Sequence, residues 1–193
     1  MQNSRKGKIV AVLVVLSCVA CVCTTPAFAG YFAVGAGYGG EGENASVSIE
    51  TGQNGIDFSG LDMLFGLGLP IIPYGDSKLP TDTIDGSCPN DDCVRSSIEY
   101  SGTELGLYAK IGLKLFLDNL YLNVIGGGTV VTESEIVKSP TTDRYYEAST
   151  DSVLNPMYGV GLGYFPDIYD WQLVIQIDVD NRRGVSGLVG WYW

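Results

Sequence analysis

Two acidic residues near the carboxyl end have the spacing of a catalytic pair. Asp178 and Asp180 are two positions apart, so both carboxylates face the same side of an extended strand. Such a pair can supply a general acid and a general base. The chain contains no His, which excludes Ser-His and Cys-His catalysis and zinc sites built on imidazole. Like-facing acids on a strand are more often ion-pair partners, so we predict that the protein is not an enzyme.

The cysteines predict one disulfide. Three of the five precede residue 30, which leaves Cys88 and Cys93 in the sequence C-P-N-D-D-C. An even pair in an exported chain indicates a disulfide, and this spacing closes a tight local loop. The surrounding segment 70–99 carries Asp85, Asp91 and Asp92. Their carboxylates suit a hard cation such as Ca²⁺, but no EF-hand spacing is present, so we favour a solvated acidic loop and predict no metal or cofactor.

The amino terminus has the three parts of a secretory signal peptide. Residues 1–29 contain a basic start, an apolar stretch and the small-residue site Ala27-Phe28-Ala29. The alternatives are a single membrane anchor, for which the apolar stretch is short, and a lipoprotein signal ending at Cys18. Cleavage after Ala29 leaves 164 of the 193 residues and removes three cations and no anions, so the net charge changes from −11 to −14. A surface this acidic repels nucleic acid.

Alternating side chains predict β-structure throughout the mature chain. Between Glu104 and Leu115 every second residue is apolar, Leu107 and Ile111 among them, and Gly or a more polar residue fills most positions between. Period two is the pattern of a strand. The same alternation recurs in three further segments, 30–39, 152–165 and 170–180. We find no helical period after the signal, so we expect an all-β fold.

Turn residues divide the mature chain into an even number of strands. The eight expected strands are 30–39, 44–51, 56–69, 100–116, 120–134, 152–165, 170–180 and 184–193. If both termini lie on one side, the connections on that side are short: 52–55, 117–119 and 166–169. Those on the other side include two long ones: 40–43, 70–99, 135–151 and 181–183. Short periplasmic turns and longer outer loops are typical of bacterial outer-membrane barrels.

The face opposite the apolar one is rich in Gly, which is unusual for a water-soluble barrel. Gly in a strand interior weakens the strand and packs nothing, whereas the narrow interior of an eight-stranded barrel has room for few large side chains. We therefore expect the apolar face to meet lipid and the Gly-rich face to line the lumen. Because an isolated charge is costly there, the charged residues of that face are predicted to form an ion-pair network: Glu104, Lys110, Lys114, Glu133, Asp178 and Asp180.

Aromatic residues gather at the strand ends expected to be periplasmic, where an interfacial girdle belongs. They are Tyr31, Phe32, Phe116, Tyr121, Tyr164, Phe165, Tyr169, Trp171, Trp191 and Trp193. The alternative is the ordinary aromatic core of a β-sandwich.

The signal sequence, the amphipathic strands and the carboxyl end V-S-G-L-V-G-W-Y-W resemble the small outer-membrane barrels of the OmpA, OmpX and opacity-protein type. In that family the last strand is the signal read by the barrel-assembly machinery, and it ends in an aromatic residue preceded by alternating apolar residues. The matching residues are Val185, Val189, Trp191 and Trp193. The terminal Trp in place of the usual Phe, and Gly187 at an apolar position, depart from the pattern. The resemblance implies an eight-stranded antiparallel up-and-down transmembrane β-barrel over 30–193, in the outer membrane and in contact with its lipid.

The sequence favours a barrel with a filled lumen and a structural or surface-interaction role in the cell envelope. Eight strands enclose an interior just wide enough for its side chains, so we do not expect a general porin. A narrow channel for small solutes is the first alternative, and a soluble periplasmic β-barrel or sandwich that binds a ligand is the second. The enzymes among the small barrels that this chain resembles depend on a His, which this chain lacks.

Overall fold

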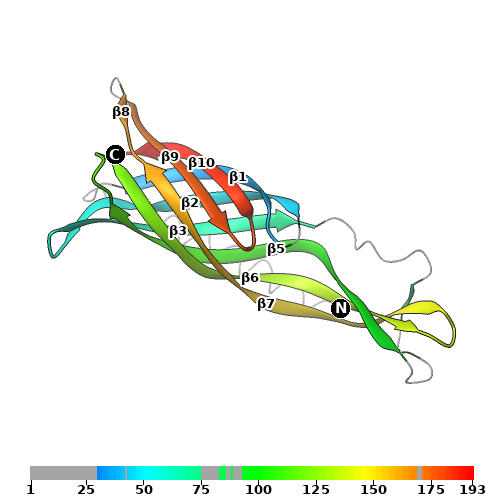
Figure 1. Ribbon diagram of the computed structural model, residues 1–193. Helices are drawn as coiled ribbons and strands as arrows, with labels where there is room; N and C mark the ends of the chain where they lie inside the picture. Colours follow the sequence, from blue (N-terminus) through cyan, green and yellow to red (C-terminus); the bar gives the residue numbers. More distant parts are fainter. Residues whose placement is uncertain (1–29, 42, 75–82, 86–87, 89–92, 169–170) are drawn as a thin grey trace, which may run out of the picture.

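The computed structural model describes residues 30–41, 43–74, 83–85, 88, 93–168 and 171–193, and the expected signal peptide 1–29 lies outside them. These residues form strands joined by turns (Figure 1). The strands are β1 (Gly30–Gly39), β2 (Asn44–Phe58), β3 (Leu61–Pro73), β4 (Ile84–Asp85), β5 (Val94–Lys114), β6 (Leu120–Ser139), β7 (Arg144–Tyr164), β8 (Asp167–Ile168), β9 (Trp171–Asp180) and β10 (Gly184–Tyr192). No helix among the described residues is long and apolar enough to cross a membrane.

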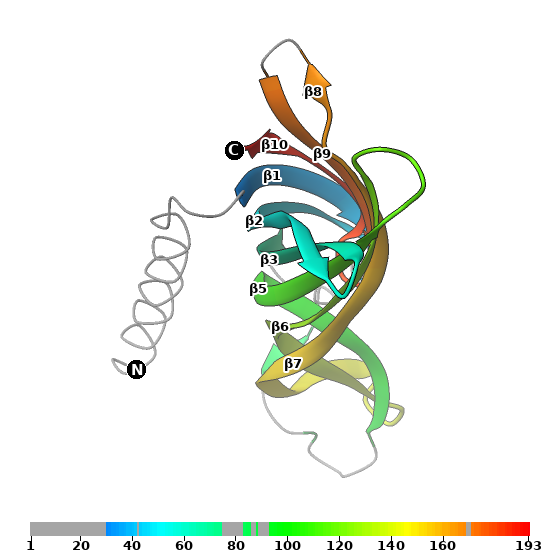
Figure 2. The ribbon, with the colours of Figure 1, turned by 90° about the vertical axis from the view of Figure 1, so that its left-hand side faces the viewer.

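The eight long strands close into a single antiparallel ring. Each pairs with its neighbours in the order β1, β2, β3, β5, β6, β7, β9 and β10, and β10 pairs back onto β1 (Figures 1 and 2). At the closing seam the backbones of Gly30 and Trp193 exchange two hydrogen bonds. The predicted all-β, eight-stranded antiparallel barrel is therefore confirmed. We call the end of the ring that holds both termini the terminal end, and the opposite one the far end.

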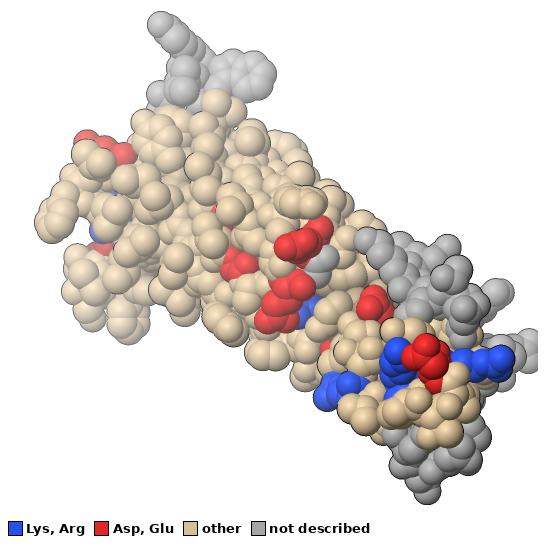
Figure 3. All heavy atoms as spheres, turned by 45° about the vertical axis from the view of Figure 1, so that its right-hand side comes forward, with Lys and Arg blue, Asp and Glu red and all other residues tan. Residues whose placement is uncertain are grey.

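Apolar side chains cover the outside of the ring, as the alternation predicts. On β5, Leu107 is 56% exposed and Ile111 is 49% exposed, whereas Tyr108 and Lys110 between them are fully buried. Val160 on β7 and Ile175 on β9 likewise point outward. In the space-filling view large parts of the barrel wall carry no charge, and the basic side chains are most numerous toward one end, with further acidic groups part-way along (Figure 3). The pattern is the reverse of that in a water-soluble domain, which buries its large apolar residues.

Two predicted connections are strand instead. Residues 52–55 lie inside β2, where the register shifts after Gln53 and Gly55 has a φ of 69°, so the Gly-rich sequence forms a bulge rather than a turn. The turn comes later, at Ser59 and Gly60, which both have positive φ, as two-residue hairpins require. The prediction of a loop at 135–151 is also wrong. There β6 and β7 stay paired as far as Ser139 and Arg144.

The strands β5, β6 and β7 project beyond the rest of the ring as a twisted sheet, which we call the extension (Figure 1). Two ion pairs lie near its surface, with Arg95 Nε 3.3 Å from Glu135 Oε1 and Lys138 Nζ 2.6 Å from Asp143 Oδ1. The Lys138 ammonium lowers the pKa of the Asp143 carboxyl. Because both faces of this sheet carry polar residues, its strands lack the regular alternation that marks the barrel wall.

The predicted loop 70–99 is shorter than expected at both ends. β3 runs on to Pro73, and its register with β5 is the same before and after Leu69 and Pro70, which are not paired with β5. A Pro has no N–H to donate, so the ladder has a gap there and the strand continues. Beyond it, the two-residue β4 pairs parallel to β7, with Ile84 opposite Tyr146.

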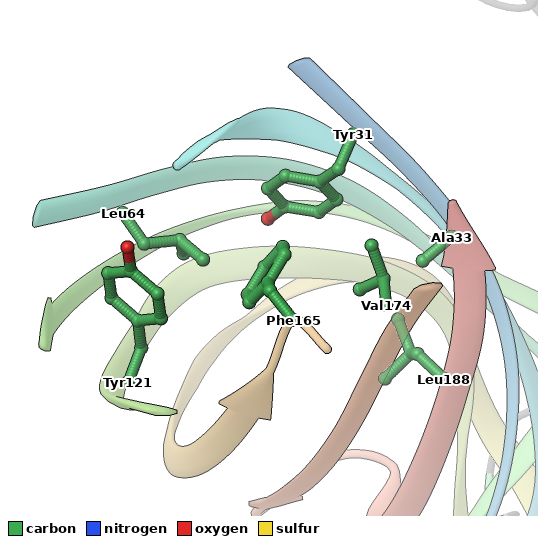
Figure 4. Packing of buried hydrophobic residues seen from close by; sticks show 7 residues of the cluster. All are labelled: Tyr31, Ala33, Leu64, Tyr121, Phe165, Val174 and Leu188. Carbon is green, nitrogen blue, oxygen red and sulfur yellow. The ribbon is translucent and has the colours of Figure 1, made fainter. Parts of the chain in front are cut away.

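Three aromatic residues assigned to the interfacial girdle lie inside the barrel. Tyr31, Tyr121 and Phe165 are almost fully buried at the terminal end, and Figure 4 shows their side chains directed toward one another. The ring of Phe165 lies 5.4 Å from each of the two Tyr rings, edge to face. This aromatic plug also contains Ala33, Leu64, Val174 and Leu188. Neighbouring residues on a strand face opposite sides, so Tyr31 points inward while Phe32 contacts Trp191 at 5.2 Å.

Candidate functional site: the ion-pair network of the lumen

Two consecutive arginines in the β9–β10 turn enter the lumen from the far end. The carboxylate of Asp180 accepts hydrogen bonds from the backbone N–H groups of Arg182, at 3.0 Å, and Arg183, at 2.7 Å. Gly184 follows with a φ of 70° and lies so close to Tyr38 that a Cβ would be 2.4 Å from the Tyr38 carbonyl oxygen. This tight turn directs both guanidinium groups inward, where their side chains are fully buried.

Arg182 closes the far end of the lumen against a buried carboxylate. Its Nε and Nη2 atoms each donate a hydrogen bond of 2.7 Å to Glu104, one to each carboxylate oxygen. The Tyr74 hydroxyl donates to the same carboxylate at 2.7 Å, and Arg182 also binds Glu41. The guanidinium carbon lies 5.6 Å from the centre of the Tyr100 ring. Paired bonds between a guanidinium and a carboxylate are among the strongest hydrogen bonds in proteins.

Lys110 and Arg183 hold a second set of carboxylates deeper in the lumen. The Lys110 ammonium lies 2.8 Å from Glu50 and 2.9 Å from Asp178, and it also donates to Gln176. Arg183 lies 2.7 Å from Asp180 and 3.2 Å from Asp178. The carboxylate of Asp178 therefore joins the two cations.

Two tyrosines complete the shell around Glu50. The hydroxyls of Tyr31 and Tyr108 each donate to it, at 2.7 and 2.8 Å. The Tyr108 ring also lies 4.5 Å from the Arg183 guanidinium carbon, a cation–π contact. The Glu50 carboxylate on β2 thus binds three side chains, one from β1 and two from β5, which ties these three strands together inside the barrel.

The structure brings four of the six predicted network residues into the lumen and places two elsewhere. Glu104, Lys110, Asp178 and Asp180 are buried and ion-paired with one another or with the two arginines. Lys114 lies near the terminal end, 3.1 Å from Asp62 and partly exposed. Glu133 lies on the extension, where it accepts a bond of 3.3 Å from Asn155.

Sequence reasoning missed three members of the network. Arg182 and Arg183 were assigned to an outer turn, where charge normally meets solvent. Glu50 was placed on the polar face of its strand and was not singled out. The alternation along the strand could have identified Glu50, because Val47 and Ile49 face outward and Glu50 therefore faces inward. For the arginines the only signal was the run of Asp, Asn and Gly that tightens their turn.

The remaining predicted residues lie on the surface. Cys88 and Cys93 form a disulfide with a Cα–Cα distance of 6.1 Å. On the last strand Val185, Val189 and Trp191 point outward from the barrel wall, and Trp193 follows the strand with its side chain half exposed. Nothing blocks the position of a Cβ at Gly187, which faces outward among them.

The arrangement of Asp178 and Asp180 is that of ion-pair partners. Both carboxylates contact Arg183, and Asp178 also contacts Lys110. A general acid and base need pKa values poised near the working pH and access to a substrate, whereas these groups are fully buried under salt bridges. Among the described residues no group of three or more His, Cys, Asp or Glu is arranged to hold a metal ion.

A closed ring of eight antiparallel strands, apolar outside and ionic inside, is a small β-barrel of the outer-membrane type. The sequence resembles this same class of barrel. No protein-family model and no curated protein sequence matches the chain. Among solved structures it is similar to Ail, the attachment invasion locus protein of Yersinia pestis, at 10% identity and a TM-score of 0.49 over 86% of this chain and 99% of that one. A second Ail structure, in complex with the heparin analogue sucrose octasulfate, is 12% identical with a TM-score of 0.42, over 86% and 95% of the chains.

Proposed function

We propose that this protein is an outer-membrane barrel whose lumen is closed to solutes and whose role in the cell envelope is structural or interactive at the surface. One observation carries the proposal. Large apolar side chains face outward around the ring, while at least seven fully or almost fully buried charged residues face inward. If water surrounded this wall, the exposed apolar surface would raise the free energy of the folded protein by about 25 cal/mol per Å². Lipid hydrocarbon removes that cost.

Side chains obstruct the lumen at three levels along its axis. The aromatic plug occupies the terminal end. Lys110 crosses the middle to Glu50 on β2 and Asp178 on β9. Arg183 binds Asp178 at the same level and reaches across the lumen to donate to the Tyr108 hydroxyl on β5. Arg182 and Tyr74 meet on Glu104 near the far end. A solute would have to displace a desolvated ion pair, which costs several kcal/mol, so we assign the protein neither porin nor enzymatic activity.

The extension is the part of the molecule that we assign to contacts outside the membrane. In this orientation the terminal end faces the periplasm, and β5, β6 and β7 continue past the lipid on the other side. The side chains of their ion pairs are partly or largely exposed there, and the half-buried Cys88–Cys93 disulfide directly precedes β5. We further propose that the signal peptide is removed after Ala29 and that the apolar residues of β10 and Trp193 are read by the barrel-assembly machinery.

The proposal is tested by folding the mature chain into lipid vesicles and comparing unheated with boiled samples on a gel. A closed transmembrane barrel migrates differently before and after boiling. A protein that stays in the aqueous fraction without detergent would be a soluble periplasmic protein, and the proposal would be wrong. The second arm is planar-bilayer recording. The closed lumen predicts no discrete openings, whereas steady openings with a defined conductance would establish the narrow-channel alternative.

A further inference from the structure

One row of outward-facing residues circles the barrel once and returns to β7 eight residues from its start. Each member is paired in register with the next. In order, the row consists of Leu162, Ile177, Gly187, Ala36, Val47, Ile71, Leu105, Val130 and Leu154. All of them are apolar or glycine, and all are exposed. Eight residues of strand span about 26 Å, so Leu154 lies much closer to the far end than Leu162 does.

The last three members of the row form an apolar surface on β5, β6 and β7, which we call the apolar ledge. Leu105, Val130 and Leu154 are 49%, 47% and 71% exposed. From each of them toward the terminal end, the outward residues of the strand are apolar or glycine. Two residues farther toward the far end, Thr132 and Ser152 end the apolar run on β6 and β7. The ledge is therefore the continuation of the apolar barrel wall.

Next to the ledge, β7 has an open edge. β9 ends at Asp180, which pairs with Gly159 of β7. Among the described residues the next strand on this edge is β4, which pairs only with Tyr146 and Glu147. Backbone N–H and C=O groups of every second residue point to the same edge of a strand. In lipid hydrocarbon each such group without a partner costs several kcal/mol, so lipid could cover this edge only where its backbone groups are bonded.

Asn181, which follows β9 in the turn, supplies those bonds. Its backbone N–H donates to the Tyr158 carbonyl oxygen at 3.2 Å. Its side-chain oxygen accepts from the Tyr158 N–H at 2.9 Å, and its side-chain nitrogen donates to the Pro156 carbonyl oxygen at 3.0 Å. Pro156 has no N–H that would need an acceptor. The backbone groups of β7 are thus satisfied past the end of β9 without a further strand.

The side chain of Asn181 takes this role because its backbone carbonyl is already used. That oxygen accepts a hydrogen bond of 3.0 Å from the N–H of Glu41 in the β1–β2 turn. In a continued ladder it would instead accept from the Tyr158 N–H, and the side-chain oxygen replaces it there. A smaller residue at this position would leave Tyr158 and Pro156 without these bonds.

We propose that hydrocarbon of the outer leaflet covers the apolar ledge and that Asn181 caps the edge of β7 against this lipid. The inference rests on the proposed membrane location and specifies how far the lipid extends along β5, β6 and β7. Lipid is the occupant because no charged residue interrupts the outward surface between the ledge and the wall. A partner strand could not pair with β7 at Tyr158 and Pro156, because these groups are already bonded.

Urea unfolding of Asn181→Ala in vesicles of short-chain and of long-chain phosphatidylcholine tests the cap. Lipid of the longer chain length reaches the uncapped edge, whereas water reaches it in the thinner bilayer. We expect the folding equilibrium constant to fall about ten-fold or more beyond its fall in the short-chain vesicles. Asn155→Ala is the control, because Asn155 lies on the opposite face of β7 and donates to Glu133. Its effect should be the same in both lipids. An equal loss for Asn181→Ala in both lipids would overturn the inference.

Lipid contacts of the unsubstituted protein test the ledge itself. In nanodiscs the methyl groups of Val130 and Leu154 should show cross-peaks with the alkyl chains, as Leu107 of the barrel wall should. The exposed Val94 of the extension should show none. Contacts at Leu107 without contacts at Val130 and Leu154 would overturn the inference and leave the proposed function intact. A lack of lipid contacts at Leu107 as well would contradict the proposed function.

Discussion

Replacing Arg182 with Gln should destabilise the barrel far more than replacing an exposed arginine. Arg182 donates two hydrogen bonds of 2.7 Å to Glu104, and both side chains are fully buried. Without the guanidinium, Glu104 keeps the hydrogen bond from the Tyr74 hydroxyl but loses its positive partner. Breaking a buried pair by removing one partner costs about 3–5 kcal/mol, because a buried charge is left unbalanced. At about 1.4 kcal/mol per factor of ten, the folding equilibrium constant should fall by roughly a hundred-fold to a few thousand-fold.

The assay is urea unfolding of the protein in lipid vesicles, followed by the heat-modifiable gel band. Arg95→Gln is the matched control, because Arg95 pairs with Glu135 at 3.3 Å while their side chains are 59% and 40% exposed. Such surface pairs contribute about 0–1 kcal/mol. The double variant Glu104→Gln with Arg182→Gln removes both charges and should recover much of the loss. Equal costs for the two arginine variants would refute the reasoning that the lumen pair is desolvated.

Two further substitutions test the packing inside the barrel. Gly68→Ala places a Cβ 2.1 Å from the Tyr108 ring, so the free energy of unfolding in urea should fall by about 1–3 kcal/mol. In the control Gly187→Ala the new Cβ meets open space, and the free energy of unfolding should change by no more than about 0.5 kcal/mol. Equal losses in the two variants would contradict this packing. Phe165→Ala removes the centre of the aromatic plug and should cost about 3–5 kcal/mol. Phe116→Ala is the control, because Phe116 is fully exposed and its loss should stay within about 0.5 kcal/mol. An equally small loss in Phe165→Ala would contradict the packing of the plug.

The barrel itself was predictable because its rule is simple and repeated. Each ring strand alternates between lipid and lumen, and Leu107, Ile111, Val160 and Ile175 all lie on the predicted side. The same rule placed Lys110 and Asp178 inside. The girdle assignment of Tyr31, Tyr121 and Phe165 was wrong because it used their position near a strand end, whereas alternation alone puts each of them inside, next to an outward neighbour.

The far end was harder to predict because lipid no longer constrains it. The extension carries polar residues on both faces, so its strands look like loops in sequence. At the terminal end, Gly52 to Gly55 look like a turn in sequence, and the pairing of β2 with β3 shows that they form a bulge. The inward course of Arg182 and Arg183 depends on the carboxylate of Asp180 binding their backbone, a contact that no spacing rule expresses.

The direction of the apolar side chains is the claim on which the whole account depends, and NMR contacts with lipid measure it directly. In nanodiscs or micelles the methyl groups of Leu107, Val124 and Ile175 should show cross-peaks with the alkyl chains. Those of Val174 and Leu188 in the plug should show none. The opposite result, with lipid contacts at Val174 and Leu188 and none at Leu107 and Ile175, would mean that the apolar residues form a dry core and that the protein is not a membrane barrel.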